Sequence, residues 1–406
     1  MDSFGLLGRT LGHSWSPEIH RQLVGYPYEL YEVEPEEVER FLASTDLAGM
    51  NVTIPYKKTV LPLCVTLSDA ARSVGSVNTL VRTPAGWHGD NTDYAGFAAL
   101  VRSSGVPVTG KKALIFGTGG ASLAVLTVLR DLGADPVIRV SRSGPDNYEN
   151  LEKHADAAIL VNATPVGMYP KNGVSPVELA AFPACEAVFD LIYNPLKTKL
   201  VLDAEARGIP ASGGLLMLVA QARRSAEQFA GRSIPDARVT EITENLARSM
   251  RNIVLIGMPG CGKTTVGKLL AQRLGREFMD ADAEVVARAG TDIPSLFASE
   301  GEAGFRARET AVLADLGKRS SLVLATGGGC VTRPENAALL RQNGVVVWLK
   351  RALDRLPTSG RPLSQQNPVQ ALYAARRDLY AAFADYTVES DEILEHTVSR
   401  ILEDVT

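Results

Sequence analysis

The chain has 406 residues, of which 45% are hydrophobic and 22% are charged, and its formal net charge is −4. That length suits two or three domains, because a single domain usually holds about 100–200 residues. The slightly acidic balance lacks the basic surface that nucleic-acid binding needs, and no apolar run approaches the roughly 18 residues of a transmembrane helix. We therefore expect a globular protein with no nucleic-acid or membrane partner.

The four cysteines, Cys64, Cys185, Cys261 and Cys330, lie far apart and form no CxxC pair. They suggest neither a metal site nor a disulfide framework, which favours a reducing compartment. The first residues lack the basic start and the apolar stretch of a signal peptide. The expected location is cytoplasmic.

Apolar runs with the length of strands alternate with helical patterns, and this alternation predicts α/β architecture with largely parallel sheets. The expected strands are Lys111–Phe116, Pro136–Val140, Ala158–Val161, Ala187–Leu191, Asn252–Ile256, Ser321–Ala325 and Val345–Leu349. The clearest helical patterns between them are Ala121–Leu132, Leu215–Phe229, Val239–Leu246 and Val266–Leu274.

A domain boundary is expected near Arg248. The helical pattern that begins at Leu215 is interrupted at Gly231 and Pro235, and a fresh strand begins at Asn252. No flexible Gly/Ser linker separates the two halves, so we expect a short and fairly fixed connection.

A glycine-rich turn follows the expected strand Lys111–Phe116. It reads Gly117-Thr118-Gly119-Gly120-Ala121 and opens a helix. Strand, turn and helix together predict a Rossmann unit that holds a dinucleotide pyrophosphate at the helix N-terminus. The next strand ends in Ser141-Arg142-Ser143 and not in an acidic residue. An arginine with hydroxyl neighbours suits a 2′-phosphate, which predicts NADP(H) over NAD; an ordinary exposed loop arginine is the alternative.

A series of longer motifs surrounds this unit. Their order along the chain is Gly12-His13-Ser14-Trp15-Ser16-Pro17, Met50–Lys57, Gly75–Thr79, Gly89–Asp93, Asn162–Met168, Asp190–Pro195 and Gly213–Gln221. The series resembles shikimate dehydrogenase from residue 4 to about residue 247. The resemblance implies a two-lobed dehydrogenase: a substrate-binding domain over 1–108, completed by 213–247, and a Rossmann NADP-binding domain over 109–212, with the site in the cleft between the two lobes.

The resemblance also assigns roles in the reduction of a ring ketone. Lys57 and Asp93 match the catalytic pair, in which the ammonium protonates the developing alkoxide and the carboxylate holds the ammonium. Ser14 and Ser16 match the hydroxyls that bind the substrate carboxylate. Further substrate contacts are matched by Thr53, Asn78, Tyr193 and Gln221. The cofactor is expected at Gly117, Gly119, Gly120, Ala121, Ser141, Arg142 and Ser143, with Met217 against the nicotinamide.

The second half opens with a strand, a loop over Gly257–Thr264 and a helix, which is the context of a phosphate-binding P-loop. The glycines let backbone N–H groups face phosphate oxygens. Lys263 can neutralise the β- and γ-phosphates, and the Thr264 hydroxyl can hold Mg²⁺. ATP is therefore expected at Gly257, Gly260, Gly262, Lys263, Thr264 and Thr265.

Five further motifs follow the P-loop: Asp280-Ala281-Asp282, Gly301–Arg306, Thr326–Gly329, Arg361-Pro362-Leu363 and Arg376–Tyr380. In this order the set resembles shikimate kinase from Met250 to Thr406. The resemblance implies a P-loop domain over 248–406 whose parallel sheet is like that of the nucleoside-monophosphate kinases, with a lid that moves over the ATP.

The kinase resemblance assigns a pocket for a small hydroxy acid. Arg306 and Arg376 match the carboxylate-binding arginines, whose planar forks suit that anion. Asp282 matches the residue that holds the reacting hydroxyl, and Asp280 supports Mg²⁺ with Thr264. The remaining matches are Gly327, Gly328 and Gly329 for close approach of the substrate, Arg361 for the transferring phosphate and Arg355 beside the adenine. The lid stretch 356–364 is shorter than is usual in the family.

Together the two resemblances imply a bifunctional enzyme of the route to chorismate, which supplies aromatic amino acids. The first half would reduce 3-dehydroshikimate with NADPH, and the second would phosphorylate shikimate with MgATP. Two alternatives remain: a dehydrogenase that acts on a related acid such as quinate, and a kinase half that is kept as a ligand-binding module with weak activity because of its short lid. Monomer and homodimer both remain possible.

Overall fold

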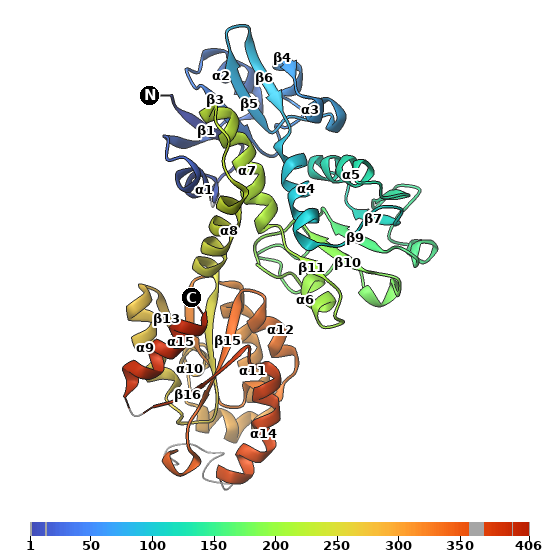
Figure 1. Cartoon of the computed structure of the whole chain (residues 1–406). Coiled ribbons are helices and arrows are strands. Elements are labelled where there is room, and N and C mark those ends of the chain that lie inside the picture. Colours follow the sequence, from blue (N-terminus) through green and yellow to red (C-terminus); the bar gives the residue numbers. More distant parts are fainter. Residues whose placement is uncertain (1, 13, 357–368, 392, 406) are drawn as a thin grey trace. The chain divides into compact units, whose positions relative to one another are not determined.

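The computed structural model describes residues 2–12, 14–356, 369–391 and 393–405. The chain divides into two compact units (Figure 1). The first comprises Met1–Met168, Val174–Tyr193 and Leu200–Leu246, and the second comprises Tyr169–Gly173, Asn194–Lys199 and Ala247–Thr406. No helix in the described part of the chain is long and apolar enough to cross a membrane.

The N-terminal lobe of the first unit is built on a mixed six-stranded sheet in the order β2-β1-β3-β5-β6-β4. Its strands are β1 (Phe4–Gly8), β2 (Tyr28–Glu32), β3 (Gly49–Val52), β4 (Cys64–Leu67), β5 (Thr79–Thr83) and β6 (Gly86–Asp90). β5 runs antiparallel to both of its neighbours, and a tight turn from Thr83 to Gly86 returns the chain into β6. The other three strand pairings of this sheet are parallel, and the sequence analysis named no strand before residue 111.

Helices cover this sheet, and apolar residues that face it form the core of the lobe. The helices are α1 (Ser16–Leu23), α2 (Val38–Ser44), α3 (Asp69–Val74) and α7 (Leu215–Ala230). The central side chains, such as Leu7, Met50 and Leu80, are fully buried. α7 comes from the end of the unit, so the lobe is completed by a segment distant in sequence.

The second lobe of this unit carries a fully parallel sheet in the order β11-β10-β9-β7-β8. The strands are β7 (Ala113–Phe116), β8 (Val137–Val140), β9 (Ile159–Asn162), β10 (Ala187–Asp190) and β11 (Ala211–Ser212), with helices α4 (Thr92–Ser104), α5 (Gly120–Asp131) and α6 (Lys199–Glu205). The four longer strands lie within two residues of the predicted ones. They were predictable because parallel strands buried on both faces read as continuous apolar runs.

Helices α4 and α7 pack closely against each other and connect the two lobes (Figure 1). Gly96 of α4 makes this possible, because a Cβ at that position would lie 2.7 Å from Met217 O of α7. The first turn of α4 carries Asp93, and α7 carries Gln221. The helix pair therefore brings together site residues that are more than 120 positions apart.

The second unit is a parallel sheet in the order β13-β14-β12-β15-β16. The strands are β12 (Asn252–Ile256), β13 (Glu277–Asp280), β14 (Leu322–Ala325), β15 (Gly344–Lys350) and β16 (Tyr386–Glu389). The helices are α8 (Asp236–Met250), which runs across the unit boundary, α9 (Lys263–Leu274), α10 (Ala281–Ala289), α11 (Ile293–Lys318), α12 (Glu335–Arg341), α14 (Val369–Phe383) and α15 (Leu394–Val405).

In this unit α9 contacts α15 and α11 contacts α12, and Figure 1 shows the sheet between the two pairs. Short 3₁₀ turns in the two units lie at Pro35–Glu37, Leu61–Leu63, Leu151–His154, Leu179–Ala181, Cys330–Thr332 and Leu353–Arg355. The central strand β12 leads directly into the P-loop. The loop therefore lies at the carboxyl edge of the sheet, where ligands of open α/β sheets bind.

Gly317 provides a test of the packing in the second unit. A Cβ there would overlap the carbonyl oxygen of Leu339, because α11 and α12 approach closely at this point. We expect Gly317→Ala to lower the free energy of unfolding of this unit by about 1–3 kcal/mol, the usual cost of overpacking. Amide hydrogen exchange of peptides from β14 and β15 measures the change. Lys318→Ala, in the same helix, should have a much smaller effect, and equal effects would contradict the packing argument.

Candidate active sites

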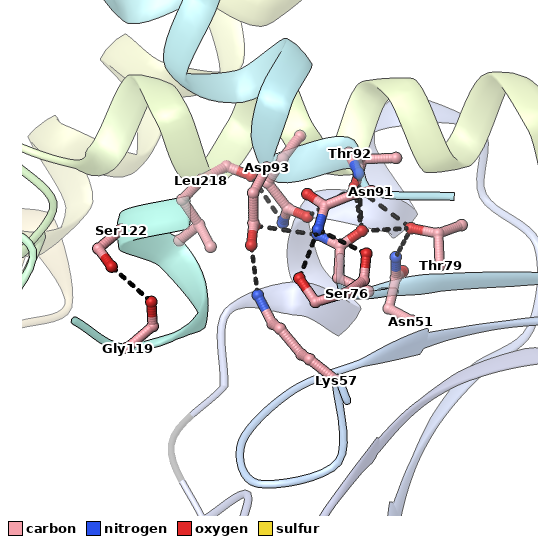
Figure 2. Close-up of polar contacts among 12 residues, drawn as sticks. Asn51, Lys57, Ser76, Thr79, Asn91, Thr92, Asp93, Gly119, Ser122 and Leu218 are labelled. Carbon is pink, nitrogen blue, oxygen red and sulfur yellow. Dashed lines mark hydrogen bonds and ion pairs between the residues drawn. The ribbon is translucent and has the colours of Figure 1, made fainter. Parts of the chain in front are cut away.

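A lysine–aspartate pair lies in a cavity of about 400 Å³ in the first unit (Figure 2). Lys57 comes from the loop after β3, and Asp93 lies in the first turn of α4, where the helix dipole favours a negative charge. Lys57 Nζ is 2.5 Å from Asp93 Oδ2, and the two side chains are 17% and 10% exposed. The pair is thus shielded from bulk water yet open to a ligand in the cavity.

The remaining substrate residues predicted from the sequence line the same cavity. They are Ser14, Ser16, Thr53, Asn78, Tyr193 and Gln221, and Met217 lines it too. Asn78 Nδ2 also donates to Asp93 Oδ1 at 2.9 Å, and burial raises the pKa of Tyr193. Apart from the ion pair the polar groups are neutral hydroxyls and amides. Such a lining suits a small polyhydroxylated molecule with one anionic group.

Asn51 also lines this cavity and was missed by the sequence analysis. Its signal was available: Asn51 is two residues before Thr53, and side chains two apart on a strand point to the same face. Asn51 is buried, and its side chain bonds to Tyr28 and Thr79.

A second, larger cavity of about 950 Å³ adjoins the first, since Thr53, Lys57 and Ala121 line both. Its other lining residues include the predicted cofactor residues Gly117, Gly119, Gly120, Ser141 and Arg142, together with Lys58 and Tyr148. None of its lining residues in the described chain is acidic, whereas three are cationic. This cavity therefore suits a polyanion whose reactive end reaches Lys57.

The glycine-rich turn at the mouth of α5 requires glycine at Gly117. The residue has φ 108°, and a Cβ there would lie 2.9 Å from Ala163 O. Ser143, by contrast, is not among the residues that line the cavity. The chain turns at Ser141, whose hydroxyl accepts a hydrogen bond from Gly144 N. The predicted cofactor contact of Ser143 has no geometric support here.

In the second unit the P-loop borders a cavity of about 650 Å³. Gly260, Gly262, Lys263, Thr264 and Thr265 line it. Lys263 is buried, and its Nζ donates to the carbonyl oxygens of Gly257 at 2.9 Å and Met258 at 3.1 Å. Gly257 itself does not line the cavity. Its φ of 142° and its close approach to Leu349 O fix the loop against β15, so its glycine is structural.

Two oxygen donors meet beside the P-loop. Thr264 Oγ1 donates to Asp280 Oδ2 at 2.8 Å, while Asp280 Oδ1 accepts from the backbone N–H of Asp282 at 3.0 Å and so caps α10. A hydroxyl and a carboxylate are hard oxygen ligands that suit Mg²⁺. No group of three or more His, Cys, Asp or Glu in the described residues could hold a metal alone. The pair therefore fits a Mg²⁺ ion that arrives with nucleotide phosphates.

The rest of this cavity is lined by the residues predicted for a hydroxy acid: Asp282, Arg306, Gly327, Gly328, Gly329 and Arg376. Arg376 donates to Gly328 O at 3.2 Å. Burial, and then the charge of Asp280, raises the pKa of Asp282. Asp282 Oδ1 is buried without a hydrogen-bond partner among the described residues. Buried carboxylate oxygens normally accept a hydrogen bond, so we expect a ligand to supply the hydrogen-bond donor here.

Glu309 was also missed by the sequence analysis. It is fully buried and accepts from Arg306 Nη1 at 2.7 Å, and Arg306 also pairs with Glu302 at 3.3 Å. Burial raises the pKa of Glu309. The signal was the spacing of three residues between Arg306 and Glu309, which places both on one helix face.

The arginines expected around the nucleotide are placed less completely. Arg355 is exposed and does not line the cavity, so its adenine contact remains a prediction. Arg361 and the stretch 357–364 of the lid lie outside the described residues. Arg351, one residue after β15, is half-buried and lines the cavity, although the sequence analysis did not single it out.

Comparison with known proteins gives a family for each half. Residues 6–80 match the family model of the shikimate dehydrogenase substrate binding domain, and residues 259–406 match that of shikimate kinase. A shikimate dehydrogenase (NADP⁺) of Clostridium beijerinckii is 35% identical over 246 residues, which cover 56% of this chain and 91% of that protein.

Solved structures agree for the first half. A shikimate 5-dehydrogenase of Thermus thermophilus, in complex with NADP(H) and shikimate, is 31% identical with a TM-score of 0.55, and covers 60% of this chain and 99% of that one. A quinate dehydrogenase of Corynebacterium glutamicum, in complex with NAD, is 25% identical with a TM-score of 0.55, over 61% and 99% of the two chains.

The buried pair of the second unit yields a stability prediction. Glu309→Ala would leave Arg306 charged and buried without its main partner, and breaking a buried pair in this way costs about 3–5 kcal/mol. We expect that loss in the free energy of unfolding of the second unit, measured by amide hydrogen exchange of β12 and β14. Glu300→Ala, which breaks the exposed pair with Arg308 in the same helix, should leave the exchange unchanged. Equal exchange in both variants would show that Glu309 is not needed to hold Arg306.

Proposed function

This chain belongs to the shikimate dehydrogenase family and continues into a shikimate kinase domain, and we propose that it catalyses two consecutive reactions. The first half reduces 3-dehydroshikimate to shikimate with NADPH. The second half phosphorylates shikimate with MgATP to give shikimate 3-phosphate. The product of the first site is thus the substrate of the second.

One observation carries the first assignment: Lys57 and Asp93 lie in one cavity with neutral hydroxyl and amide side chains. That cavity adjoins the larger cavity, of about 950 Å³, that is lined by the glycine-rich turn. Bound NADPH supplies the hydride. As the ketone carbon is reduced, Lys57 Nζ would give a proton to the ketone oxygen, so that a hydroxyl forms and a neutral amine remains. Asp93 holds that amine in place through its 2.5 Å contact. Ser14 and Ser16 bind the substrate carboxylate by donating hydrogen bonds from their neutral hydroxyls.

The cofactor assignment rests on charge. Arg142 and Lys58 line a cavity that has no acidic residue in the described part of the chain, so its charge attracts a 2′-phosphate. The NADP-linked relatives support this assignment. Quinate with NAD remains the second candidate, because a quinate dehydrogenase shares this fold. Steady-state kcat/KM with both acids and both nicotinamides distinguishes them: a higher value for quinate with NAD would refute our assignment.

In the second half the chemistry is phosphoryl transfer. Asp282 accepts the hydroxyl proton of shikimate. Its Oδ1 is buried and has no hydrogen-bond partner among the described residues, so it is available to the substrate hydroxyl. Arg306 and Arg376 hold the carboxylate at the same cavity. Lys263 would leave its loop carbonyls to bind the β- and γ-phosphates, and Thr264 and Asp280 would hold a Mg²⁺ ion, which would shield phosphate charge. A ligand-binding module without turnover is the alternative, and ATP binding without ADP release would favour it.

Lys57→Ala tests the dehydrogenase mechanism. We expect kcat for shikimate oxidation by NADP⁺ to fall by about 10²–10⁴, the usual contribution of a general acid–base group. Kinase activity of the same protein serves as the internal control, since Lys57 belongs to the first unit. The assignment fails if the dehydrogenase kcat is retained.

Arg306→Ala tests the kinase carboxylate site. The KM for shikimate should rise by about tenfold or more, since a charge-assisted hydrogen bond contributes roughly 1.5–3 kcal/mol. Dehydrogenase turnover should be unaffected. The matched control is Arg308→Ala, which removes an exposed arginine two residues away. An unchanged KM in Arg306→Ala would remove this residue from the carboxylate site.

A further inference from the structure

Asp93 is held at both carboxylate oxygens, and the second holder is Asn78. Lys57 Nζ contacts Oδ2, and Asn78 Nδ2 donates to Oδ1 at 2.9 Å. The orientation of the Asn78 amide follows from its other end, where Thr92 N donates to Asn78 Oδ1 at 2.7 Å. A backbone N–H can only donate, so the end facing Thr92 is the oxygen. The nitrogen end therefore faces Asp93.

Thr79 is the fully buried hydroxyl behind Asn78. Its Oγ1 accepts from Asn51 Nδ2 at 3.1 Å and donates to Asn78 Oδ1 at 3.2 Å. A hydroxyl has one hydrogen, and the bond from Asn51 leaves that hydrogen for Asn78 Oδ1 or for Thr92 Oγ1, each of which lies 3.2 Å from Thr79 Oγ1. The Thr92 hydroxyl in turn lies 3.2 Å from both Asn78 Oδ1 and Gln221 Oε1. Figure 2 shows Asn51, Thr79, Thr92 and Asp93 grouped around these bonds.

The row of hydrogen bonds begins at Tyr28. Its Oη donates to Asn51 Oδ1 at 2.8 Å, and the nitrogen end of the Asn51 amide faces Thr79. The Tyr28 ring is itself held by stacking on His20, with centroids 4.1 Å apart and an interplanar angle of 11°. The four side chains come from β2, β3, β5 and the residue before β5, so the row crosses the sheet.

We propose that Thr79 is a positioning residue for the dehydrogenase reaction, which acts on Asp93 through Asn78. With the Thr79 hydrogen on Asn78 Oδ1, the four bonds from Tyr28 to Asp93 all donate in one direction, toward the carboxylate. Aligned hydrogen bonds polarise one another, so each strengthens the donor that reaches Asp93. Asp93 is thereby held in the geometry that Lys57 needs. This inference rests on the proposed dehydrogenase function and adds Thr79, which lines neither the substrate cavity nor the cofactor cavity.

Thr79→Val tests the inference, since it keeps the branched shape and removes the hydroxyl. Asn51 Nδ2 then loses its acceptor and Asn78 Oδ1 loses one donor. We expect kcat for shikimate oxidation to fall by about 10- to 100-fold, as small misplacements of catalytic groups do. The KM values for shikimate and NADP⁺ should change by less than about threefold, because the lost interaction acts in the transition state. Thr79→Ser should restore most of the kcat.

The matched control is Thr83→Val, the same substitution on the same strand, where the hydroxyl donates only to Gly86 O. It should retain wild-type kcat. Wild-type kcat in Thr79→Val, or no recovery in Thr79→Ser, would overturn the inference. If Thr79→Val does not fold, Tyr28→Phe takes its place: a lowered kcat at unchanged KM supports the row, and an unchanged kcat refutes it. An inactive wild-type protein would instead refute the proposed function.

Discussion

The contact between Lys57 and Asp93 is the interaction on which the first half of this protein depends. Lys57 follows a central strand of the N-terminal sheet, and Asp93 begins the helix that leads into the nucleotide lobe. The ion pair is therefore only as well placed as the packing of α4 on α7, which Gly96 allows. Buried amide and hydroxyl side chains also hold the Asp93 carboxylate, so neutral groups help to position this charged side chain.

The second half must also hold a charged side chain in a buried site, and it does so with different groups. Arg306, which we propose binds the substrate carboxylate, is buried, and the buried Glu309 accepts a hydrogen bond from it. An anionic partner lowers the cost of burying an arginine, yet it also competes with the substrate carboxylate for the same donors. Arg376 donates to the backbone carbonyl of Gly328 and contributes a second cation to the same cavity. Under the proposed function the two sites bind the same acid in two ways, through hydroxyls in the first and through arginines in the second.

The sequence was informative where a ligand constrains the chain and less so where only packing does. Glycine-rich loops and buried parallel strands such as Asn252–Ile256 were predictable, because close approach to phosphate and burial on both faces each leave a local pattern. The mixed sheet of the N-terminal lobe leaves a weaker sequence pattern, and the sequence analysis missed that sheet. Asn51 acts through partners that the fold brings together. Thr79, for example, lies 28 residues from Asn51, so no local sequence pattern predicts the hydrogen bond between them.

The central claim is that one chain carries both reactions on the same acid. The most direct measurement incubates the full-length protein with 3-dehydroshikimate, NADPH and MgATP while NADPH oxidation, ADP formation and shikimate 3-phosphate are followed together. We predict that NADPH is consumed first and that ADP and shikimate 3-phosphate then form in equal amounts, up to the amount of NADPH oxidised. NADPH oxidation without ADP formation, or ADP formation that does not depend on NADPH, would contradict it.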